Sequence, residues 1–364
     1  MNNRTLLVGE PMGLFVAEET GLFERVNHYT FTTCGAEFNT AIGLRRLGQS
    51  VGFFTKLGDD PFGKRILAMM NQNGISTELV ELCKERPTGF MLKSKVVNGD
   101  PEIFYLRKNS AASTIGPEDI ADLDLSCYSA IHMTGIFPAL SQSTRNAALL
   151  LMERAKQEGI FISFDPNLRP ALWPDEQTMI ETLNALAFKA DLFLPGIQEA
   201  RLLSGLYSPE EICTFYQNHH AGMVILKMGP EGAWYSTPSQ QGYIAGFKVD
   251  AVVDTVGAGD GFAAGVLSGI HDGLSIEQAV RRGNGVGAIQ VMSLGDNDGL
   301  PILEELEAFM NGSPAWSQNR RPHTSFEVRP MIKISLQIPG IQASLDPMPL
   351  DEYREQAAIE EPFE

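Results

Sequence analysis

The stretch "DTVGAGDGFAAG", Asp254–Gly265, decides how the fold is interpreted, because closely spaced glycines surround a carboxylate. Glycine lets a backbone adopt positive φ and approach an anion closely. Placed before a helix, Gly257, Ala258 and Gly259 would direct free N–H groups outward at the positive end of the helix dipole. We therefore predict an anion hole that opens a helix, with Asp260 in the first helical turn.

An anion hole beside a carboxylate suits phosphoryl transfer. Asp260 would take a proton from a hydroxyl group, and the N–H groups would hold the charge of the transferred phosphoryl group. The other interpretation is a glycine-rich helix start that serves only tight packing. From these residues alone, both interpretations remain open.

Outside this stretch, the chain alternates between strand-like and helix-like segments. From about residue 120 onward, "SAIHMTG", "TRNAALLLMERAKQEG", "IFISFD" and "QTMIETLNALAFKA" follow one another. This rhythm predicts βαβ units and a mainly parallel sheet. Nearer the N-terminus, "AEFNTAIGLRRLG" has helical spacing and ends at Gly48, while "TGFMLKSKVV" and "EIFYLRK" are predicted to pair around "NGD".

Composition limits the class of protein and its partners. The chain has 364 residues, 43% hydrophobic content and a formal net charge of −17. This charge argues against nucleic acid or an anionic membrane as a partner, and no apolar run reaches the length of a membrane span. The N-terminus has no signal-peptide layout, and no C-x-x-C occurs, so we expect a cytoplasmic protein without disulfides. Its four cysteines are Cys34, Cys83, Cys127 and Cys213.

Two long motifs resemble the signatures of the PfkB, or ribokinase-like, carbohydrate kinases. The C-terminal signature is similar to "DTVGAGDGFAAGVL", and the N-terminal one to "CGAEFNTAIGLRRLGQSVGFFTKLGDDPFG". The resemblance runs from about residue 4 to 311, and Cys34 stands where the family usually has a glycine. The matching positions of the first signature are Gly35, Asn39, Ala41, Leu47, Gly48, Gly58, Asp60 and Gly63.

This resemblance implies a fold and a domain organisation. The fold would be an α/β class, three-layer α/β/α sandwich with a mainly parallel central sheet and a small β-sheet lid. The kinase domain would cover residues 1–312, with lid segments near 12–33 and 86–108. Residues 313–364 would form an extension of unknown role, in which "MIKISLQI" is the one strand-like run. The family's lids also serve as dimer interfaces, so the resemblance implies a homo-oligomer.

The resemblance further implies ATP and Mg²⁺ as cofactors and leaves a monovalent cation such as K⁺ open. Lys227, Gly229 and Gly232 are similar to an element that borders the ATP phosphates, together with Gly257 and Gly259. Asn284 matches a position near the adenine, and Glu199 matches a glutamate implicated indirectly in Mg²⁺ placement, although Gly196 replaces the usual asparagine. Taken alone, the Lys227–Gly232 stretch could equally be an ordinary hairpin turn. Asn284 could equally be a packing amide, and Glu199 a solvated charge on a helix face.

Within the family, "EIFYLRKNSAAS" and "FDPNLRPALWP" look most like 2-keto-3-deoxygluconate kinases, which phosphorylate the terminal primary hydroxyl of a sugar acid. Arginine captures carboxylates in bidentate fashion, so the acid would be read by arginines in otherwise uncharged surroundings. The resemblance implies a sugar site of Gly35, Asn39, Tyr105, Arg107, Arg169 and Asp260.

Other functions remain open at this stage. A fructokinase or another sugar kinase of the same family would keep the chemistry and change the substrate, and "DPNLRPALWP" also resembles fructokinases. A non-catalytic sugar-sensing protein is the alternative of a different class. The P-loop-like "GDDPFGKR" has Arg65 where a P-loop needs Ser or Thr, and "VGEPMG" is not a dinucleotide-binding fingerprint.

Overall fold

The structure is a computed structural model that describes residues 4–96, 101–293 and 295–313. All of these lie in the first of two compact units, Met1–His323, and the second unit, Thr324–Glu364, lies outside them. The "NGD" turn, the "MIKISLQI" strand and, Ser313 aside, the extension predicted at 313–364 therefore remain predictions.

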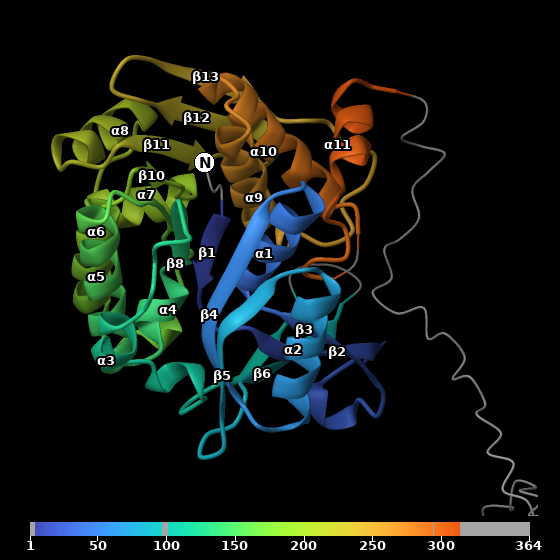
Figure 1. Cartoon of the computed structure of the whole chain (residues 1–364). Helices are drawn as coiled ribbons and strands as arrows, with labels where there is room; N and C mark the ends of the chain where they lie inside the picture. The colour runs from blue at the N-terminus through green and yellow to red at the C-terminus, as the bar shows by residue number, and fades with distance from the viewer. Residues whose placement is uncertain (1–3, 97–100, 294, 314–364) are drawn as a thin grey trace, which may run out of the picture. The chain divides into compact units, whose positions relative to one another are not determined.

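The predicted mainly parallel sheet is confirmed and has nine strands, in the order β13-β12-β11-β10-β9-β8-β1-β4-β5 (Figure 1). All neighbouring strands pair in parallel except β11 with β12 and β12 with β13, which are antiparallel. The strands are β1 Arg4–Val8, β4 Ser50–Gly58, β5 Ser76–Cys83, β8 Ala130–Thr134, β9 Phe161–Asp165, β10 Leu192–Phe193, β11 Met223–Lys227, β12 Gly232–Ser236 and β13 Gln241–Ala245.

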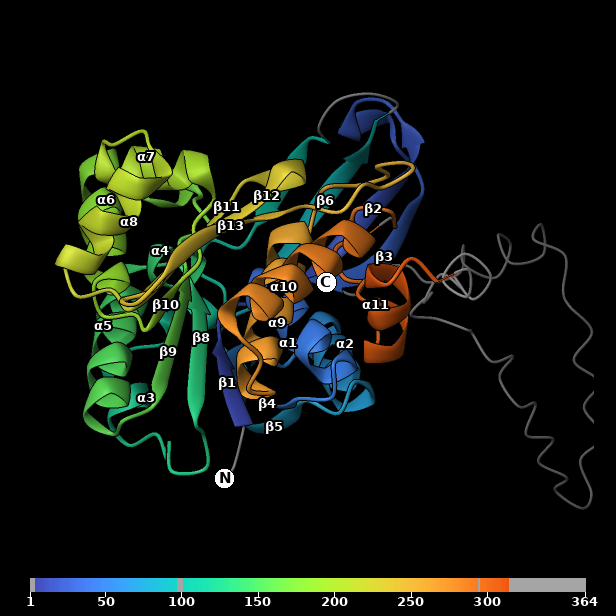
Figure 2. The same cartoon turned by 90° about the horizontal axis from the view of Figure 1, so that it is seen from above.

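Helices cover both faces of this sheet, so the chain has three layers (Figure 2). One face carries α3 Pro117–Ala121, α4 Ile136–Ala139, α5 Gln142–Gln157, α6 Glu176–Ala187, α7 Ile197–Ser204 and α8 Pro209–Asn218. The other carries α1 Ala36–Arg46, α2 Pro61–Gln72, α9 Ala258–His271, α10 Ile276–Gln290 and α11 Leu303–Met310. Short 3₁₀ helices are η1 Phe23–Arg25, η2 Ala112–Thr114, η3 Pro170–Leu172 and η4 Gly229–Glu231.

The sequence of the central strands is mostly apolar and does not alternate between apolar and polar residues, because both faces of the sheet are covered. In β1, Leu6 and Val8 join the core under α5 and α6, whereas Leu7 joins the core under α1 and α9. Successive strand residues point to opposite faces, and both faces are covered, so apolar residues follow one another along these strands. No described helix has the length and hydropathy needed to cross a membrane.

The predicted lid is a separate four-stranded sheet in the order β3-β2-β6-β7. Its strands are β2 Met12–Thr20, β3 Tyr29–Cys34, β6 Phe90–Lys95 and β7 Ile103–Leu106, which fall in the two predicted segments. One lid face packs on α2, where the rings of Phe15, Phe31 and Phe90 lie within 6 Å of Phe62. The lid is therefore anchored by aromatic contacts to the layer that contains α1 and α9.

A buried ion cluster ties the lid to the glycine-rich stretch. Lys93 of β6 is 5% exposed. Its Nζ lies 2.6 Å from Asp254 Oδ2 and 3.5 Å from Asp296 Oδ1. Asp254 begins the "DTVGAGD" stretch, and its Oδ1 accepts the N–H of Val256 at 3.1 Å. One ammonium group therefore connects the lid, the start of this stretch and the loop after α10.

Lys93→Met should destabilise the protein, because it leaves two buried carboxylates without their cation. Removing one partner of a buried ion pair costs about 3–5 kcal/mol of unfolding free energy, and urea unfolding at pH 7.5 measures the loss. The loss should shrink at pH 5, since burial raises the pKa of Asp296 to about 6 against the opposing charge of Lys93. The control is Lys95→Met, an exposed lysine of the same strand that donates to the Glu18 carbonyl. Equal losses for both variants would contradict the cluster's role.

Candidate active site

The anion hole is predicted at the start of a helix, and the structure begins helix α9 at this position. Gly257 precedes the helix with φ of 78°, a left-handed conformation that favours glycine. A Cβ at this position would also collide with the backbone carbonyl of Asp296. The first N–H groups of a helix lack intrahelical partners, and Ala258 N–H makes only a long 3.4 Å bond to the Thr255 carbonyl. Donors are therefore available where an anion is expected.

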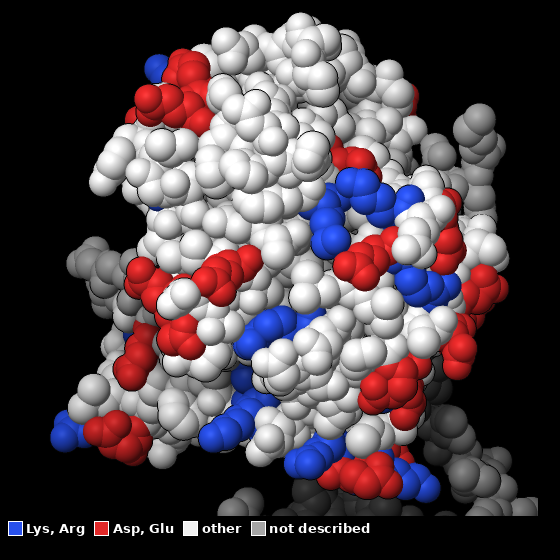
Figure 3. Space-filling model, turned by 90° about the vertical axis from the view of Figure 1, so that its left-hand side faces the viewer, with Lys and Arg blue, Asp and Glu red and all other residues white. Residues whose placement is uncertain are grey.

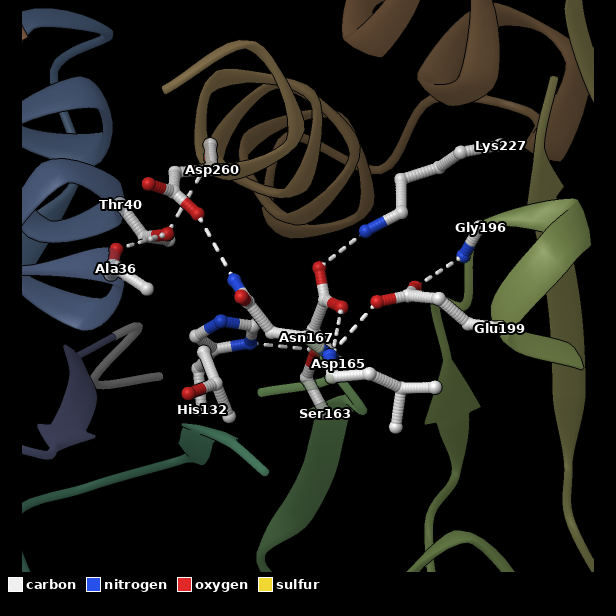
Figure 4. A network of polar contacts seen from close by, with 12 residues as sticks. Ala36, Thr40, His132, Ser163, Asp165, Asn167, Gly196, Glu199, Lys227 and Asp260 are labelled. Carbon is white, nitrogen blue, oxygen red and sulfur yellow. Dashed lines mark hydrogen bonds and ion pairs between the residues drawn. The ribbon is translucent and has the colours of Figure 1, made fainter. Parts of the chain in front are cut away.

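Asp260 lies in the first turn of α9 and is 9% exposed. The side-chain amide of Asn39 donates to its Oδ2 at 2.8 Å. Figure 4 shows the second contact, in which the side-chain amide of Asn167 donates to Oδ1 at 3.4 Å. Burial raises the pKa of Asp260 to about 7; the Asn39 hydrogen bond opposes this rise, Asp165 adds to it, and Lys227 and Arg169 oppose it. A carboxylate that titrates near neutral pH is well matched to general base work.

Lys227, predicted beside the ATP phosphates, ends β11 and forms an ion pair with Asp165 at the end of β9. Ligands of open α/β sheets bind outside these carboxyl ends of parallel strands. A Cβ built on Gly259 would lie 3.6 Å from the lysine Nζ. The structure therefore brings this ammonium group next to the anion hole, although its present partner is a carboxylate.

The other residues predicted to bind ATP have structural contacts of their own. Gly229 and Gly232 form the turn between β11 and β12, and a Cβ on Gly232 would overlap the backbone of β13. Asn284 of α10 donates to the carbonyls of Ile244 and Ala245 at 3.1 and 3.3 Å. A hairpin turn and a packing amide are thus present, and the nucleotide roles remain predictions.

Glu199 is a capping residue rather than a solvated charge on a helix face. Its Oε2 accepts the N–H of Gly196 at 2.6 Å, and its Oε1 accepts the N–H of Leu168 at 2.8 Å (Figure 4). The glutamate thereby joins the start of α7 to the "DPNLR" loop. Within residues 4–96, 101–293 and 295–313, no group of three or more His, Cys, Asp or Glu side chains could hold a metal. Mg²⁺ needs only one or two carboxylates when phosphates supply other ligands. Glu199, with both oxygens on backbone N–H groups, is compatible with the indirect role implied by the resemblance, which stays a prediction.

The two arginines expected to read a carboxylate differ in their surroundings. Arg107 is buried, and its Nε and Nη2 lie 2.7 and 2.5 Å from Glu10 Oε2. Arg169 is exposed, donates to the Leu168 carbonyl at 2.7 Å, and acts electrostatically on Asp260. Arg107 is therefore already paired with a carboxylate of the chain, whereas no such pair engages Arg169 among the described residues.

The remaining residues of the predicted sugar site lie around the same edge of the sheet or on the lid. Gly35 precedes α1, and a Cβ there would lie 2.8 Å from the Glu10 carbonyl. Tyr105 of β7 is 40% exposed, with its ring centroid 5.7 Å from the Arg107 guanidinium carbon. Asn39 is 2% exposed and points at Asp260, so the structure gives its amide a partner other than a sugar.

Sequence reasoning missed three polar contacts of this site. Glu10 neutralises Arg107, Asn167 contacts Asp260, and Asn297 donates to Asn39 Oδ1 at 3.0 Å. For Asn167, the available signal was an asparagine within the loop "DPNLR". Its φ of 36° is a backbone conformation that asparagine adopts more readily than most residues other than glycine. No local pattern marks Glu10 or Asn297.

The chain belongs to a known family of kinases. The model of the pfkB family of carbohydrate kinases matches residues 5–303. A 2-dehydro-3-deoxygluconokinase of Bacillus subtilis (strain 168) is 45% identical over 313 residues, which cover 86% of this chain and 97% of that protein. One from Thermoproteus tenax is 31% identical over 313 residues, covering 83% and 93%.

A solved structure supports the same assignment. The crystal structure of a PfkB protein from Polaromonas sp. JS666 is 41% identical, covers 84% of this chain and 99% of that chain, and superimposes with a TM-score of 0.78. The ribokinase-like fold that the sequence motifs implied is therefore confirmed.

Asp260→Asn should stabilise the protein more at pH 8 than at pH 5. A carboxyl group with a pKa of about 7 in the native state and about 4 when unfolded binds its proton more tightly when folded. The free energy of unfolding therefore falls as the pH rises from the pKa of the unfolded state to that of the native state. Asparagine does not titrate, so the variant does not show this loss. Urea unfolding of both proteins at the two pH values measures the effect. An identical difference in unfolding free energy at pH 5 and pH 8 would mean that Asp260 titrates normally.

Proposed function

We propose that the protein is an ATP-dependent kinase of 2-keto-3-deoxygluconate, the sugar acid also called 2-dehydro-3-deoxygluconate. It would phosphorylate the terminal primary hydroxyl to give 2-keto-3-deoxy-6-phosphogluconate and ADP. The observation that carries the proposal is the desolvated Asp260 carboxylate in the first turn of α9, directly beside the N–H groups of Gly257–Gly259. The similarity to 2-dehydro-3-deoxygluconokinases supports the choice of substrate.

The reaction needs a base and a stabilised phosphoryl group. Asp260 accepts the proton of the terminal hydroxyl as its oxygen attacks the γ-phosphorus in line, and the ADP oxygen leaves. The N–H groups of Gly257, Ala258 and Gly259 stabilise the charge on the transferred group. The lid closes over the sugar and excludes water, which would otherwise accept the phosphoryl group.

Mg²⁺ would neutralise charge on the ATP phosphates. Glu199 and Asp165 are the carboxylates of the chain that would hold it, both indirectly. The two oxygens of Glu199 accept backbone N–H groups, and those of Asp165 accept from the N–H of Asn167 and from Lys227. Lys227 would approach the phosphates from its place beside Gly259. Gly229, Gly232 and Asn284 would border the nucleotide, and a monovalent cation such as K⁺ stays an open prediction.

The substrate carboxylate would bind Arg169. An exposed guanidinium within electrostatic reach of Asp260 can take a carboxylate without breaking a buried ion pair. Arg107 would act differently, by fixing the end of β7 through Glu10 and thereby placing Tyr105 against the sugar. A hydrogen bond to a charged group contributes about 1.5–3 kcal/mol, so Arg169 would favour the acid over a neutral sugar by about tenfold or more.

The remaining partner predictions concern the surface and the compartment. On the face shown in Figure 3, Lys and Arg side chains are interspersed with Asp and Glu rather than gathered in one basic area. This pattern and the net charge of −17 support the proposal that small molecules, not nucleic acid or membranes, are the partners. A homo-oligomer and a cytoplasmic location stay predictions.

Asp260→Asn should lower the rate of ADP release with Mg·ATP and 2-keto-3-deoxygluconate by roughly 10²–10⁴-fold, since it removes the general base. The assay compares that sugar acid with fructose, ribose and gluconate. Turnover that favours fructose would keep the kinase and replace the substrate. Silence of the wild type on every sugar would favour the sugar-sensing alternative.

Arg169→Ala should raise KM for 2-keto-3-deoxygluconate by tenfold or more and leave any turnover of fructose within about twofold. The matched control is Arg201→Ala, a half-buried arginine that also donates to a backbone carbonyl, that of Tyr207. Equal losses on the acid and on the neutral sugar would show that Arg169 does not bind the carboxylate.

A further inference from the structure

Asp260 is held by a chain of side-chain amides that has a fixed direction. Asn39 Nδ2 donates to Asp260 Oδ2 at 2.8 Å, and Asn39 Oδ1 accepts from Asn297 Nδ2 at 3.0 Å. Asn39 and Asn297 are 2% and 4% exposed. Both amides are thus shielded from water, and their orientation depends on the partners that the protein supplies.

A main-chain carbonyl sets the polarity of this chain. Asn297 Nδ2 also donates to the carbonyl of Thr33 at 3.3 Å. A carbonyl oxygen can only accept, so the amide nitrogen of Asn297 must face Thr33 and, with it, Asn39. Asn39 must then turn its oxygen toward Asn297 and its nitrogen toward Asp260. The orientation of the Asn39 amide follows from this network.

We propose that Asn297 is a positioning residue that locks the Asn39 amide in the orientation that donates to Asp260, and thereby holds Asp260 in its ionised form. A proton on Asp260 Oδ2 would face the NH₂ group of Asn39, and Asn39 could accept that proton only after a half-turn of its amide. That half-turn would place two NH₂ groups face to face at Asn297. The lock therefore penalises the protonated acid. This inference rests on the proposed role of Asp260 as the base.

Other charged groups also act on Asp260 and must be kept apart from this effect. Asp165 of β9 raises its pKa, whereas Lys227 of β11 and Arg169 before η3 lower it. Asn167 contacts Oδ1, and the hydroxyl of Thr40 donates to the backbone carbonyl of Asp260 at 3.3 Å. None of these residues needs to change in a test made at Asn297.

Asp296, next to Asn297 in the chain, titrates in the same pH range. Burial raises its pKa to about 6, and it faces Lys93 and Asp254. A shift that came from Asp296 would not depend on Asn39. A second substitution at Asn39 therefore separates the two groups.

The experiment measures kcat/KM of the full chain for 2-keto-3-deoxygluconate between pH 5 and pH 9. On the acid side of this profile, the acid limb, kcat/KM falls as Asp260 is protonated. In Asn297→Leu, the midpoint of the acid limb should rise by about one pH unit, the scale expected for one hydrogen bond to a charged group. Activity at pH 9 should stay within about twofold of the wild type. Asn297→Asp has nearly the same size, and once it is ionised its carboxylate can only accept, so it turns Asn39 around and should shift the limb further. If the leucine variant does not fold, the aspartate variant carries the test.

The double variant Asn39→Leu/Asn297→Leu provides the control. Asn39→Leu should itself raise the acid limb, and adding Asn297→Leu should then change nothing, because Asn297 acts through Asn39. An unchanged limb with a uniformly lower kcat would make Asn297 a merely structural residue. A higher KM for the sugar in both backgrounds, without a pH shift, would make it a substrate contact. Either result overturns the proposal.

A readout without turnover separates this inference from the proposed function. The protein is labelled with ¹³C at aspartate carboxyl carbons, and the Asp260 signal is assigned by its loss in Asp260→Asn. The pH titration of that signal should move upward by about one unit in Asn297→Leu, even if the wild type phosphorylated none of the sugars. An Asp260 titration that is the same in both proteins would refute the lock.

Discussion

The burial of one carboxylate at the start of α9 is the constraint on which the site depends. Desolvation disfavours the charge of Asp260 and raises its pKa to about 7. The positive end of the helix dipole and the Asn39 hydrogen bond act in the opposite direction. The balance leaves a carboxylate that is partly ionised at neutral pH yet more basic than that of an exposed aspartate. Without the burial this carboxylate would be less basic, and without the donors it would be protonated.

Close helix packing makes this balance possible. A Cβ on Gly43 of α1 would lie 2.7 Å from that of Ala264 in α9, and a Cβ on Gly265 would lie 2.7 Å from the Cα of Gly283 in α10. These small residues let α1 and α10 approach α9 closely enough to exclude water and to bring Asn39 within hydrogen-bond distance of Asp260. The glycines of the helix contacts and those of the predicted anion hole thus serve one purpose, because the packing creates the desolvated environment in which Asp260 lies.

The parts of the site that the sequence predicted are those encoded locally. The start of α9 at Gly257, the turn at Gly229 and Gly232 and the paired strands β6 and β7 follow from short-range conformational preferences, and the structure has each of them. Pairings between distant segments leave no periodic trace. Glu10 lies 97 residues from Arg107, and Asn297 lies 258 residues from Asn39. Arg107 therefore resembled a free carboxylate receptor in the sequence, although the fold supplies it with an internal carboxylate.

The distribution of charge around Asp260 bears on how so acidic a chain would bind the anionic substrates proposed for it. Lys227 is balanced by Asp165, and Arg107 by Glu10, so these pairs add little net field. Within the described residues, the ion pairs include no partner for Arg169. This arginine and the N–H groups at the start of α9 are then the local positive features that oppose a net charge of −17. Because long-range attraction is screened within about 8 Å at physiological salt, such local groups decide whether an anionic sugar and a nucleotide can bind there.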